Sequence, residues 1–441
     1  MALIIGLYII EGLLCYAFGM PNASNDVCEI VSVILLAGNS IALSMYVMKR
    51  YSNYSKQLST IFCISVFIKM FLIIWDYYGT SIFILPNSHS DSESYHWSAV
   101  RIAHHLSGKI ENYGIIIGYI YKLFGIQRIT AQFSNTILSF IGISALEKIM
   151  HNLKISKSSR EKTLFFSALL PNYLIISSIL IRECLISIIL CFALYFFIKW
   201  WKTNNYVVFL EAILISFLAC YYHSGAIAVT IGFSITLVLT KWQNNERVVN
   251  VSFKSLILAV ILGIVFMYLF NVLSESILWR FHGLGMDSLN TYIDEHHLYE
   301  EHSEGTSSYS AGFSGISGIP GLIINTPIRT IYFLWVPMPW SIRGIGDIIA
   351  FFGSSLFYGG TIFYTISKLY KHQCSNSTKS ILIAIFCVAL SSAVVFAWGV
   401  ESAGTALRHR EKFYFIYLLL FALLQENNLI MRNVEINGQQ K

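Results

Sequence analysis

The sequence predicts an all-α, polytopic membrane protein, and its composition and apolar runs are the basis of this prediction. Of the 441 residues, 55% are hydrophobic and only 12% are charged. Soluble globular chains carry about 25% charged residues. About twelve apolar runs are long enough to cross a hydrocarbon layer roughly 30 Å thick. Many of the aromatic residues, 15% of the chain, stand near the ends of these runs, where they favour the membrane interface.

The expected spans extend along the whole chain, which we expect to form a single integral membrane domain, residues 1–441. Their approximate bounds are 2–19, 29–48, 58–76, 129–149, 163–180, 184–201, 205–221, 224–240, 255–275, 347–368, 379–399 and 412–426. The first run lacks a basic leader and a clear cleavage site, so we expect it to be retained as a helix.

Basic residues alternate between the loops and predict an orientation. One set of loops holds 18 of the 30 Lys and Arg residues and five acidic residues, while the opposite set holds 11 basic and 17 acidic residues. By the positive-inside rule the first set is cytoplasmic. Both termini belong to that set. We therefore expect a multi-pass protein of the cell inner membrane with both termini in the cytoplasm.

Two long loops fall on the opposite, periplasmic side, at 77–128 and 275–346. The first contains two stretches expected to lie on the membrane surface as helices, 94–107 and 113–124. The second contains the apolar piece 331–340, which we expect to be an interfacial or re-entrant helix stopped by Pro337 and Pro339.

The first long loop also holds the strongest candidate for chemistry. Asp91 and Glu93 stand two residues apart at an expected helix start, next to serines that can cap it. One interpretation is that Asp91 merely caps the positive end of a surface helix. The other is that it acts as a general base or a carboxylate ligand at the membrane surface. Spacing alone leaves both open.

A set of short motifs resembles a known pattern. The motifs are Asp91-Ser92 with Tyr95, Phe124-Gly125, Gln132 with Asn135, Ala168-Leu169-Leu170-Pro171, Ser177-Ser178, Arg182-Glu183, Gly404 and Arg408-His409-Arg410. In this combination the chain resembles the GT-C-type, polyprenyl-dependent membrane glycosyltransferases, such as aminoarabinose transferase and protein mannosyltransferase relatives. The resemblance covers residues 91–201 and, more weakly, the C-terminal part. It departs from the pattern by two extra spans before the loop and by Tyr113-Gly114 in place of a histidine-proline-proline element. These departures leave the acceptor class open.

The resemblance implies an enzyme that takes a sugar from a polyprenyl phosphate or diphosphate at the outer face, in the assembly of O-antigen, capsule or lipopolysaccharide. Asp91 then activates or orients the acceptor hydroxyl, with Glu93 as the second candidate. Tyr95, His96 and His105 are expected to line the acceptor side.

Arginines are the candidates for holding the lipid phosphate, because a guanidinium fork matches phosphate oxygens. The candidates on the expected outer side are Arg182, Arg408, Arg410, Arg343 and Arg329. The alternative for each is that it anchors the end of a span by snorkelling.

Neither a cofactor nor a nucleic-acid partner is predicted; the expected partners are the polyprenyl-linked saccharide and the membrane. No metal site is assigned, although Asp91-x-Glu93 has the chemistry to bind a divalent cation with a lipid diphosphate. The segment 294–304 combines His, Asp and Glu, and is either a metal cluster or an exposed acidic loop. The eight cysteines form no Cys-x-x-Cys pair and are expected to be small buried residues.

Two alternatives to a single-sugar transferase remain. An O-antigen or oligosaccharide repeat-unit polymerase also has many spans, long outer loops and outer arginines. A flippase or transporter for the same lipids requires charged residues along a path through the bilayer. Only Glu11, Lys69 and Glu211 stand clearly within the expected spans, which favours an enzyme.

Overall fold

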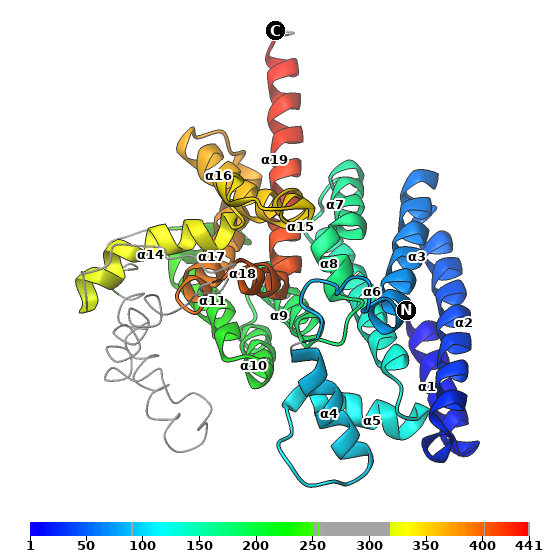
Figure 1. Ribbon diagram of the computed structural model, residues 1–441. Coiled ribbons are helices and arrows are strands. Elements are labelled where there is room, and N and C mark those ends of the chain that lie inside the picture. The colour runs from blue at the N-terminus through cyan, green and yellow to red at the C-terminus, as the bar shows by residue number, and fades with distance from the viewer. Residues whose placement is uncertain (90, 251–254, 256, 258–317, 401, 440–441) are drawn as a thin grey trace. The chain divides into compact units, whose positions relative to one another are not determined.

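The computed structural model describes residues 1–89, 91–250, 255, 257, 318–400 and 402–439 (Figure 1). In this part of the chain the regular structure is helical except for one antiparallel hairpin, in which β1 (Thr240–Gln243) pairs with β2 (Glu246–Val249). The described chain is therefore nearly all-α, and the hairpin is its one departure from the predicted all-α class.

Seven helical segments among the described residues are long and apolar enough to cross a membrane. They are α2 (Asn25–Tyr51), α3 (Lys56–Tyr78), α6 (Arg128–Asn152), α9 (Glu183–Thr203), the continuous segment Ile345–Tyr370, α17 (Asn376–Ala397) and the segment Ala403–Val434. Three shorter apolar segments are α1 (Ala2–Ala17), α10 (Tyr206–Tyr222) and Ser224–Leu239, which joins the 3-10 turn η2 (Ser224–Ala226) to α11 (Ile227–Leu239). All ten coincide with expected spans, and the total of about twelve stays a prediction.

The expected span 163–180 is instead two helices. α7 (Lys157–Leu169) stops just before Pro171, and α8 (Pro171–Ile176) starts there. Proline lacks the N–H that a continuous helix needs, and it drives the preceding residue out of the helical region. Leu170 accordingly has an extended backbone, with ψ of 112°. The remaining expected span, 255–275, lies outside the described residues apart from Ser255 and Ile257.

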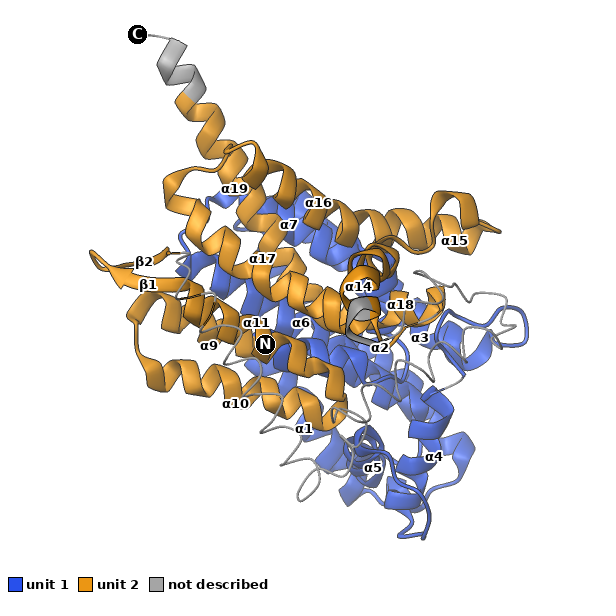
Figure 2. Cartoon of the chain, turned by 90° about the vertical axis from the view of Figure 1, so that its left-hand side faces the viewer, with its two compact units in different colours: residues 1–191 blue, residues 192–441 orange. Residues whose placement is uncertain are grey.

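The chain forms two compact units, residues 1–191 and 192–441 (Figure 2). Helix α9 begins in the first unit and ends in the second. The first long loop is largely helical: α4 (Asp91–Ala103) and α5 (Asn112–Phe124) form a hairpin in unit 1. A 3-10 turn, η1 (Met20–Asn22), joins α1 to α2.

Two buried polar pairs join α3 to α6 in unit 1. Asp76 accepts a hydrogen bond from Gln132, and Lys69 donates one to Ser139. Because 69 and 76 are seven apart, as are 132 and 139, these pairs lie on one face of each helix about two turns apart. The helices therefore run antiparallel. At the other end of unit 1, Arg50 pairs with Glu147 at 2.6 Å.

In unit 2 only the first half of the expected interfacial piece 331–340 is helical. Residues 331–335 are the last part of a longer helix, α14 (Gly318–Trp335), which stops two residues before Pro337, as expected from the two prolines. The other elements of this unit are η4 (Pro339–Ser341), α15 (Ile345–Ala350), the π-helical turn η5 (Phe351–Ser355), α16 (Leu356–Tyr370), α18 (Ala403–Arg410), η6 (Glu411–Phe413) and α19 (Tyr414–Gln439).

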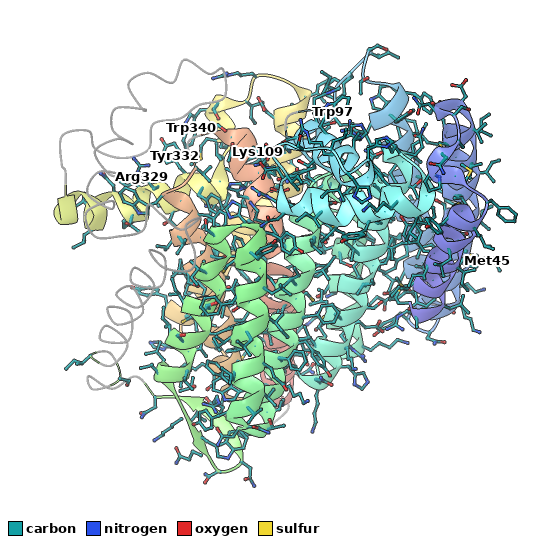
Figure 3. All side chains as sticks on the ribbon, turned by 90° about the horizontal axis from the view of Figure 1, so that it is seen from below. Met45, Trp97, Lys109, Arg329, Tyr332 and Trp340 are labelled. Atoms are coloured by element: carbon teal, nitrogen blue, oxygen red, sulfur yellow. The ribbon has the colours of Figure 1, made fainter. Side chains whose placement is uncertain are left out.

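Large apolar side chains face outward along the candidate spans. Met45 on α2 is 62% exposed (Figure 3), and many Ile, Leu and Phe residues of α1, α3, α10 and α16 share this exposure. Exposed apolar side chains on long helices suit contact with lipid tails. The eight cysteines are free, and all are buried or half-buried, as expected of small core residues.

Candidate functional site

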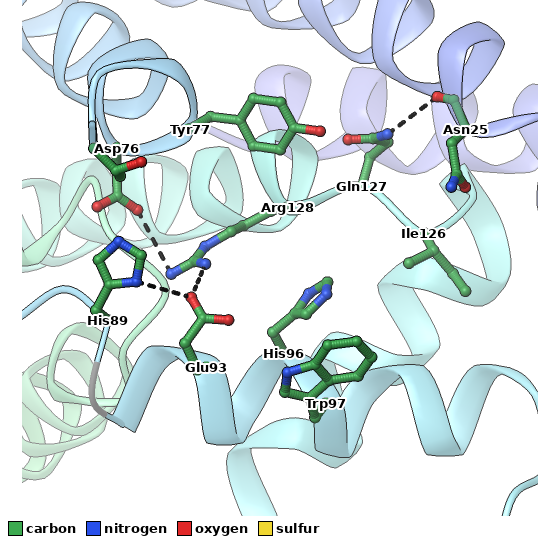
Figure 4. Close-up of a pocket in the computed structure, with 11 residues that line it drawn as sticks. Asn25, Asp76, Tyr77, His89, Glu93, His96, Trp97, Ile126, Gln127 and Arg128 are labelled. Carbon is green, nitrogen blue, oxygen red and sulfur yellow. Dashed lines mark hydrogen bonds and ion pairs between the residues drawn. The ribbon is translucent and has the colours of Figure 1, made fainter. Parts of the chain in front are cut away.

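A cavity of about 340 Å³ opens in unit 1 beside the first turns of α4 (Figure 4). The residues that line it are Asn25, Asp76, Tyr77, Thr80, His89, Glu93, His96, Trp97, Ile126, Gln127 and Arg128. The start of α2, the end of α3 and the start of α6 therefore meet α4 here. The cavity combines carboxylate, imidazole, amide and aromatic groups, which is typical of a small-molecule site.

Two glycines set the position of α4. A Cβ atom on Gly114 would lie 2.4 Å from the Cβ of Ser98, and one on Gly118 would lie 2.5 Å from the Cβ of Ile102. Only glycine permits α5 to approach α4 this closely. Residues 93, 96 and 97 share one helical face at spacings of three and four. The close packing therefore turns that face of α4 to the cavity.

Arg128, the first residue of α6, is the electrostatic centre of the site. Its guanidinium donates to Glu93 Oε1 and, at 2.9 Å, to Ser92 Oγ. The same group lies 3.7 Å from Asp76 Oδ2. Only 11% of the Arg128 side chain is exposed. One cation thus joins two carboxylates from different helices, and this holds the start of α4 beside the end of α3 (Figure 4).

Asp76 is the most deeply buried acid of the cavity, with 3% exposure. Its Oδ2 atom accepts from Gln132, while Oδ1 is buried and has no hydrogen-bond partner among the described residues. A buried acceptor without a partner costs about 1–3 kcal/mol. Arg128 compensates the charge of Asp76 but leaves one oxygen able to accept a further hydrogen bond.

Two histidines flank Glu93. His89 Nδ1 lies 3.6 Å from Glu93 Oε1, and His96 Nδ1 lies 2.8 Å from the hydroxyl of Tyr121. Burial lowers the pKa of His96, and the positive charge of Arg128 lowers it further, while Glu93 opposes them. His96 is therefore a neutral hydrogen-bonding group at neutral pH.

The two predicted carboxylates have different positions. Glu93 lines the cavity, whereas Asp91 is the first residue of α4 and does not line it. Residues two apart on a helix point about 200° away from each other. The structure thus brings Glu93 together with His96, which was also predicted, and with Arg128 and Asp76, which were not.

Tyr95 belongs to a separate polar chain within unit 1. Its ring packs edge-on against Tyr113 at 5.1 Å, and the Tyr113 hydroxyl donates to Asn135 Oδ1 at 2.9 Å. The Asn135 amide then donates to the carbonyls of Ile179 and Ile181, at 2.8 and 3.0 Å. This chain fixes the segment before α9 against α6.

Arg182 follows directly on that fixed segment. Its guanidinium lies 5.8 Å from the centre of the Tyr95 ring. Half-buried, it forms no ion pair with any residue the structure describes, and its Nε atom is buried without a hydrogen-bond partner there. A partly buried cation without an acidic partner suits an anionic ligand. Two of the predicted residues, Tyr95 and Arg182, are therefore neighbours.

Arg410 in unit 2 is held by the protein itself. It is 1% exposed and donates to the carbonyls of Leu334 and Val336, at 2.5 and 2.6 Å, and to Ser355 Oγ at 3.3 Å. These bonds attach α18 to the end of α14. Next to it, Glu411 accepts from Tyr358 at 3.0 Å, and Lys412 lies 2.6 Å from His409 Nδ1.

The other predicted residues lie elsewhere. Arg408 occupies the last turn of α18, and the backbone N–H of Arg343 donates to Asp347 Oδ2 at 2.9 Å near the start of α15. Arg329 is 3% exposed and stacks over Trp398 at 4.6 Å. His105 lies after α4 in the left-handed region, with φ of 56°, and is exposed.

The described residues contain no group of three or more His, Cys, Asp or Glu side chains placed to hold a metal ion. Asp91 and Glu93 alone do not make such a group. The other candidate, the segment 294–304, lies outside the described residues.

Comparison with models of protein families, with curated proteins and with solved structures finds no match for this chain.

Sequence reasoning missed Asp76, Trp97 and Arg128. Asp76 stands at the boundary of an expected span, where a carboxylate is easily assigned to the loop. One signal was present: Asp76 is seven residues after Lys69, so both fall on one face of α3, and both are buried. Two ionisable residues on the buried face of one apolar helix indicate a functional or paired position.

Proposed function

We propose that the chain is a membrane glycosyltransferase that uses a polyprenyl phosphate- or diphosphate-linked saccharide in the assembly of a cell-surface polysaccharide. The observation that carries the proposal is the position of Glu93. One of its oxygens is held by Arg128, and the other points away from Arg128, towards the side of the cavity where His96 and Trp97 lie (Figure 4). A carboxylate presented in this way can accept a hydroxyl group at an open site.

The reaction has one bond formed and one broken at the donor sugar. The acceptor hydroxyl oxygen bonds to the anomeric carbon, and the bond from that carbon to the phosphate oxygen breaks. The departing lipid phosphate keeps the bonding electron pair, and the hydroxyl proton passes to Glu93. Asp91, at the start of the same helix, is the second candidate for this role.

Cations are needed where the phosphate gains charge. Arg182 is the best-supported candidate, because it is half-buried and forms no ion pair among the described residues. Arg408 and Arg343 remain candidates in unit 2. The hydrogen bonds of Arg410 to two carbonyls favour a positioning role for that residue.

The topology in this proposal has about twelve spans, with loops 77–128 and 275–346 periplasmic and both termini cytoplasmic. The ends of unit 1 support it. Arg50 and Tyr54 donate to Glu147, and Arg160 donates to the Tyr54 hydroxyl, so two of the basic loops share the end remote from the cavity. The cavity lies at the start of α6, and Glu147 lies near its C-terminal end.

The same chemistry serves a polymerase that joins lipid-linked repeat units, since it too transfers a glycosyl group from a lipid diphosphate to a hydroxyl. Loss of a polymerase removes ladders of chain length, and loss of a single-sugar transferase removes one decoration.

A lipid transporter is favoured by a different observation. Lys69 and Asp76 are both buried on α3, 2% and 3% exposed, within a helix long enough to span the membrane. Buried ionisable groups on such a helix are typical of transport paths. Lys69, however, contacts a serine and two aromatic rings, the rings at 5.0 and 5.7 Å, rather than a continuous series of charges.

The test is to delete the chain in its native host and to replace it there by variants. A strain lacking the chain should accumulate the polyprenyl-linked saccharide on the outer face of the membrane and change its surface polysaccharide. Glu93→Gln at normal membrane level should behave like the deletion, with transfer reduced roughly 10²–10⁴-fold. Glu111→Gln is the matched control, because Glu111 pairs with Lys109 at 3.0 Å and does not line the cavity. Accumulation on the inner face indicates a transporter, and normal polysaccharide from both Glu93→Gln and Asp91→Asn contradicts the enzyme.

A further inference from the structure

We propose that the cavity beside α4 is a saccharide-binding subsite that selects neutral, hydroxyl-bearing rings and rejects phosphate. The inference deepens the proposed function: it makes this cavity the place of the acceptor sugar and assigns the lipid phosphate to another position.

The charges of the cavity oppose the binding of an anionic ligand. Asp76 and Glu93 contribute two negative charges, and Arg128 contributes one positive charge. The guanidinium is already bound to Glu93 and Ser92 and faces Asp76 at 3.7 Å, so it has little capacity left for a phosphate. A phosphate in this cavity would meet a net negative charge.

The hydrogen-bonding groups of the cavity instead match hydroxyl donors. Asp76 lines the cavity, and its Oδ1 atom is buried and has no hydrogen-bond partner in the described chain. Glu93 adds an oxygen directed away from Arg128 (Figure 4). Sugar hydroxyls donate to such acceptors, whereas the phosphodiester oxygens that link a sugar to its lipid carry no hydrogen to donate at neutral pH.

An aromatic wall completes the match. Trp97 (labelled in Figure 3) lines the cavity, and 56% of it is exposed. The ring of His96 packs edge-on against it, with 5.3 Å between the two ring centres. The C–H face of a sugar ring is apolar and packs on an indole, while the hydroxyls at its rim reach polar groups. Asn25 and Gln127 provide amide groups on the α2 and α6 side.

The experiment measures binding to the full chain, purified in detergent, by saturation-transfer NMR. The probes are glucose, galactose, rhamnose and N-acetylglucosamine, with inorganic pyrophosphate as a competitor. At least one sugar should bind, and pyrophosphate should not displace it. Trp97→Ala and Glu93→Gln should each weaken binding tenfold or more. Tyr119→Ala and Glu111→Gln should leave it unchanged, because Tyr119 is 61% exposed on α5 outside the cavity, and Glu111 does not line it either.

Each remaining result overturns the subsite: no sugar binds, pyrophosphate displaces the sugar, or the cavity variants bind like the wild type. Trp97 is exposed, so Trp97→Ala keeps the fold and removes misfolding as an explanation. If sugar binding depends on Trp97 but the Glu93→Gln and Asp91→Asn strains both make normal polysaccharide, the transferase proposal fails and the subsite stands. If the polysaccharide depends on Glu93 but no sugar binding depends on Trp97, the transferase proposal stands and the subsite fails.

Discussion

Arg128 on α6 binds Glu93 on α4, and this pair holds the α4–α5 hairpin of segment 77–128 against the candidate spanning helices of unit 1. The pair joins a residue at the first position of a long apolar helix to one in the first turn of a short polar helix. The stability of the hairpin and the shape of the cavity therefore depend on the same contact.

Replacing Arg128 should destabilise unit 1 strongly. Arg128→Ala leaves Asp76 buried without a cation, and breaking a buried pair in this way costs about 3–5 kcal/mol. Thermal unfolding in detergent measures the loss. Arg101→Ala is the control, since Arg101 donates to the Lys109 carbonyl at 3.1 Å in an exposed hydrogen bond and forms no ion pair with a described residue. Equal melting temperatures for the two variants would contradict the central role of Arg128.

A methyl group at Gly118 should separate α4 from α5. Gly118→Ala forces a contact of 2.5 Å with Ile102, and overpacking of this kind costs about 1–3 kcal/mol. Gly38→Ala on α2 meets no atom within 4 Å and should instead stabilise by about 0.5–1 kcal/mol, because alanine favours a helix. We therefore expect Gly118→Ala to lower the melting temperature and Gly38→Ala to raise it. The same sign for both would mean that the hairpin tolerates wider packing.

His96 should make unit 1 less stable in acid. Its folded pKa is lowered by burial and then by Arg128, so below about pH 6.5 the unfolded chain takes up a proton that the folded chain does not. The free energy of unfolding therefore falls as the pH drops below that value and is unaffected above it. Around His96 stand Glu93, Arg128 and Tyr121. His96→Gln should flatten the pH profile of the melting temperature, and an unchanged profile in that variant would contradict the assignment.

Replacing Arg410 should reduce the stability of unit 2, and any loss of activity should follow from that. Arg410→Ala removes the donors to Leu334 and Val336, and Arg410→Lys should not restore them, because one ammonium group cannot reproduce the fork. Both variants should lower the melting temperature. Each hydrogen bond lost from the charged guanidinium should reduce the free energy of unfolding by about 1.5–3 kcal/mol. Arg343→Ala, at an exposed position, should not. A stable but inactive Arg410→Ala would return Arg410 to the phosphate-binding set.

Lys69→Met separates the enzyme from the transporter. Methionine has similar length and no charge, so a purely structural lysine can be replaced with little loss of stability or with a gain. Transfer should persist in this variant. Loss of function at unchanged membrane level, with the lipid-linked saccharide left on the inner face, would favour transport. Lys122→Met, at a position on α5 away from the buried pairs, is the control.

Composition and apolar length predicted most of the helices, because lipid requires continuous apolar segments with internally paired backbones. The division of the expected span 163–180 at Pro171 was not predicted, because the hydrophobicity of the whole segment was given more weight than the single proline. The start of α4 and the stop of α14 were correctly expected from the serines, acids and prolines at those points. These two helix ends are predictable because the residues that determine them are adjacent in the sequence.

The site was less predictable for a physical reason. Asp91 and Glu93 look equivalent in the sequence, and only the rotation of α4 distinguishes them. That rotation depends on Gly114 and Gly118, two positions in another helix. Arg128 and Asp76 are 52 residues apart in the chain, and their contact depends on how α3 and α6 pack.

The amide of Asn135 has one further consequence. It accepts from Tyr113 with its oxygen and donates to the carbonyls of Ile179 and Ile181 with its nitrogen, so no isosteric acid can replace it. This single side chain of α6 therefore fixes both α5 and the backbone directly before Arg182, and the positions of the two depend on the same amide.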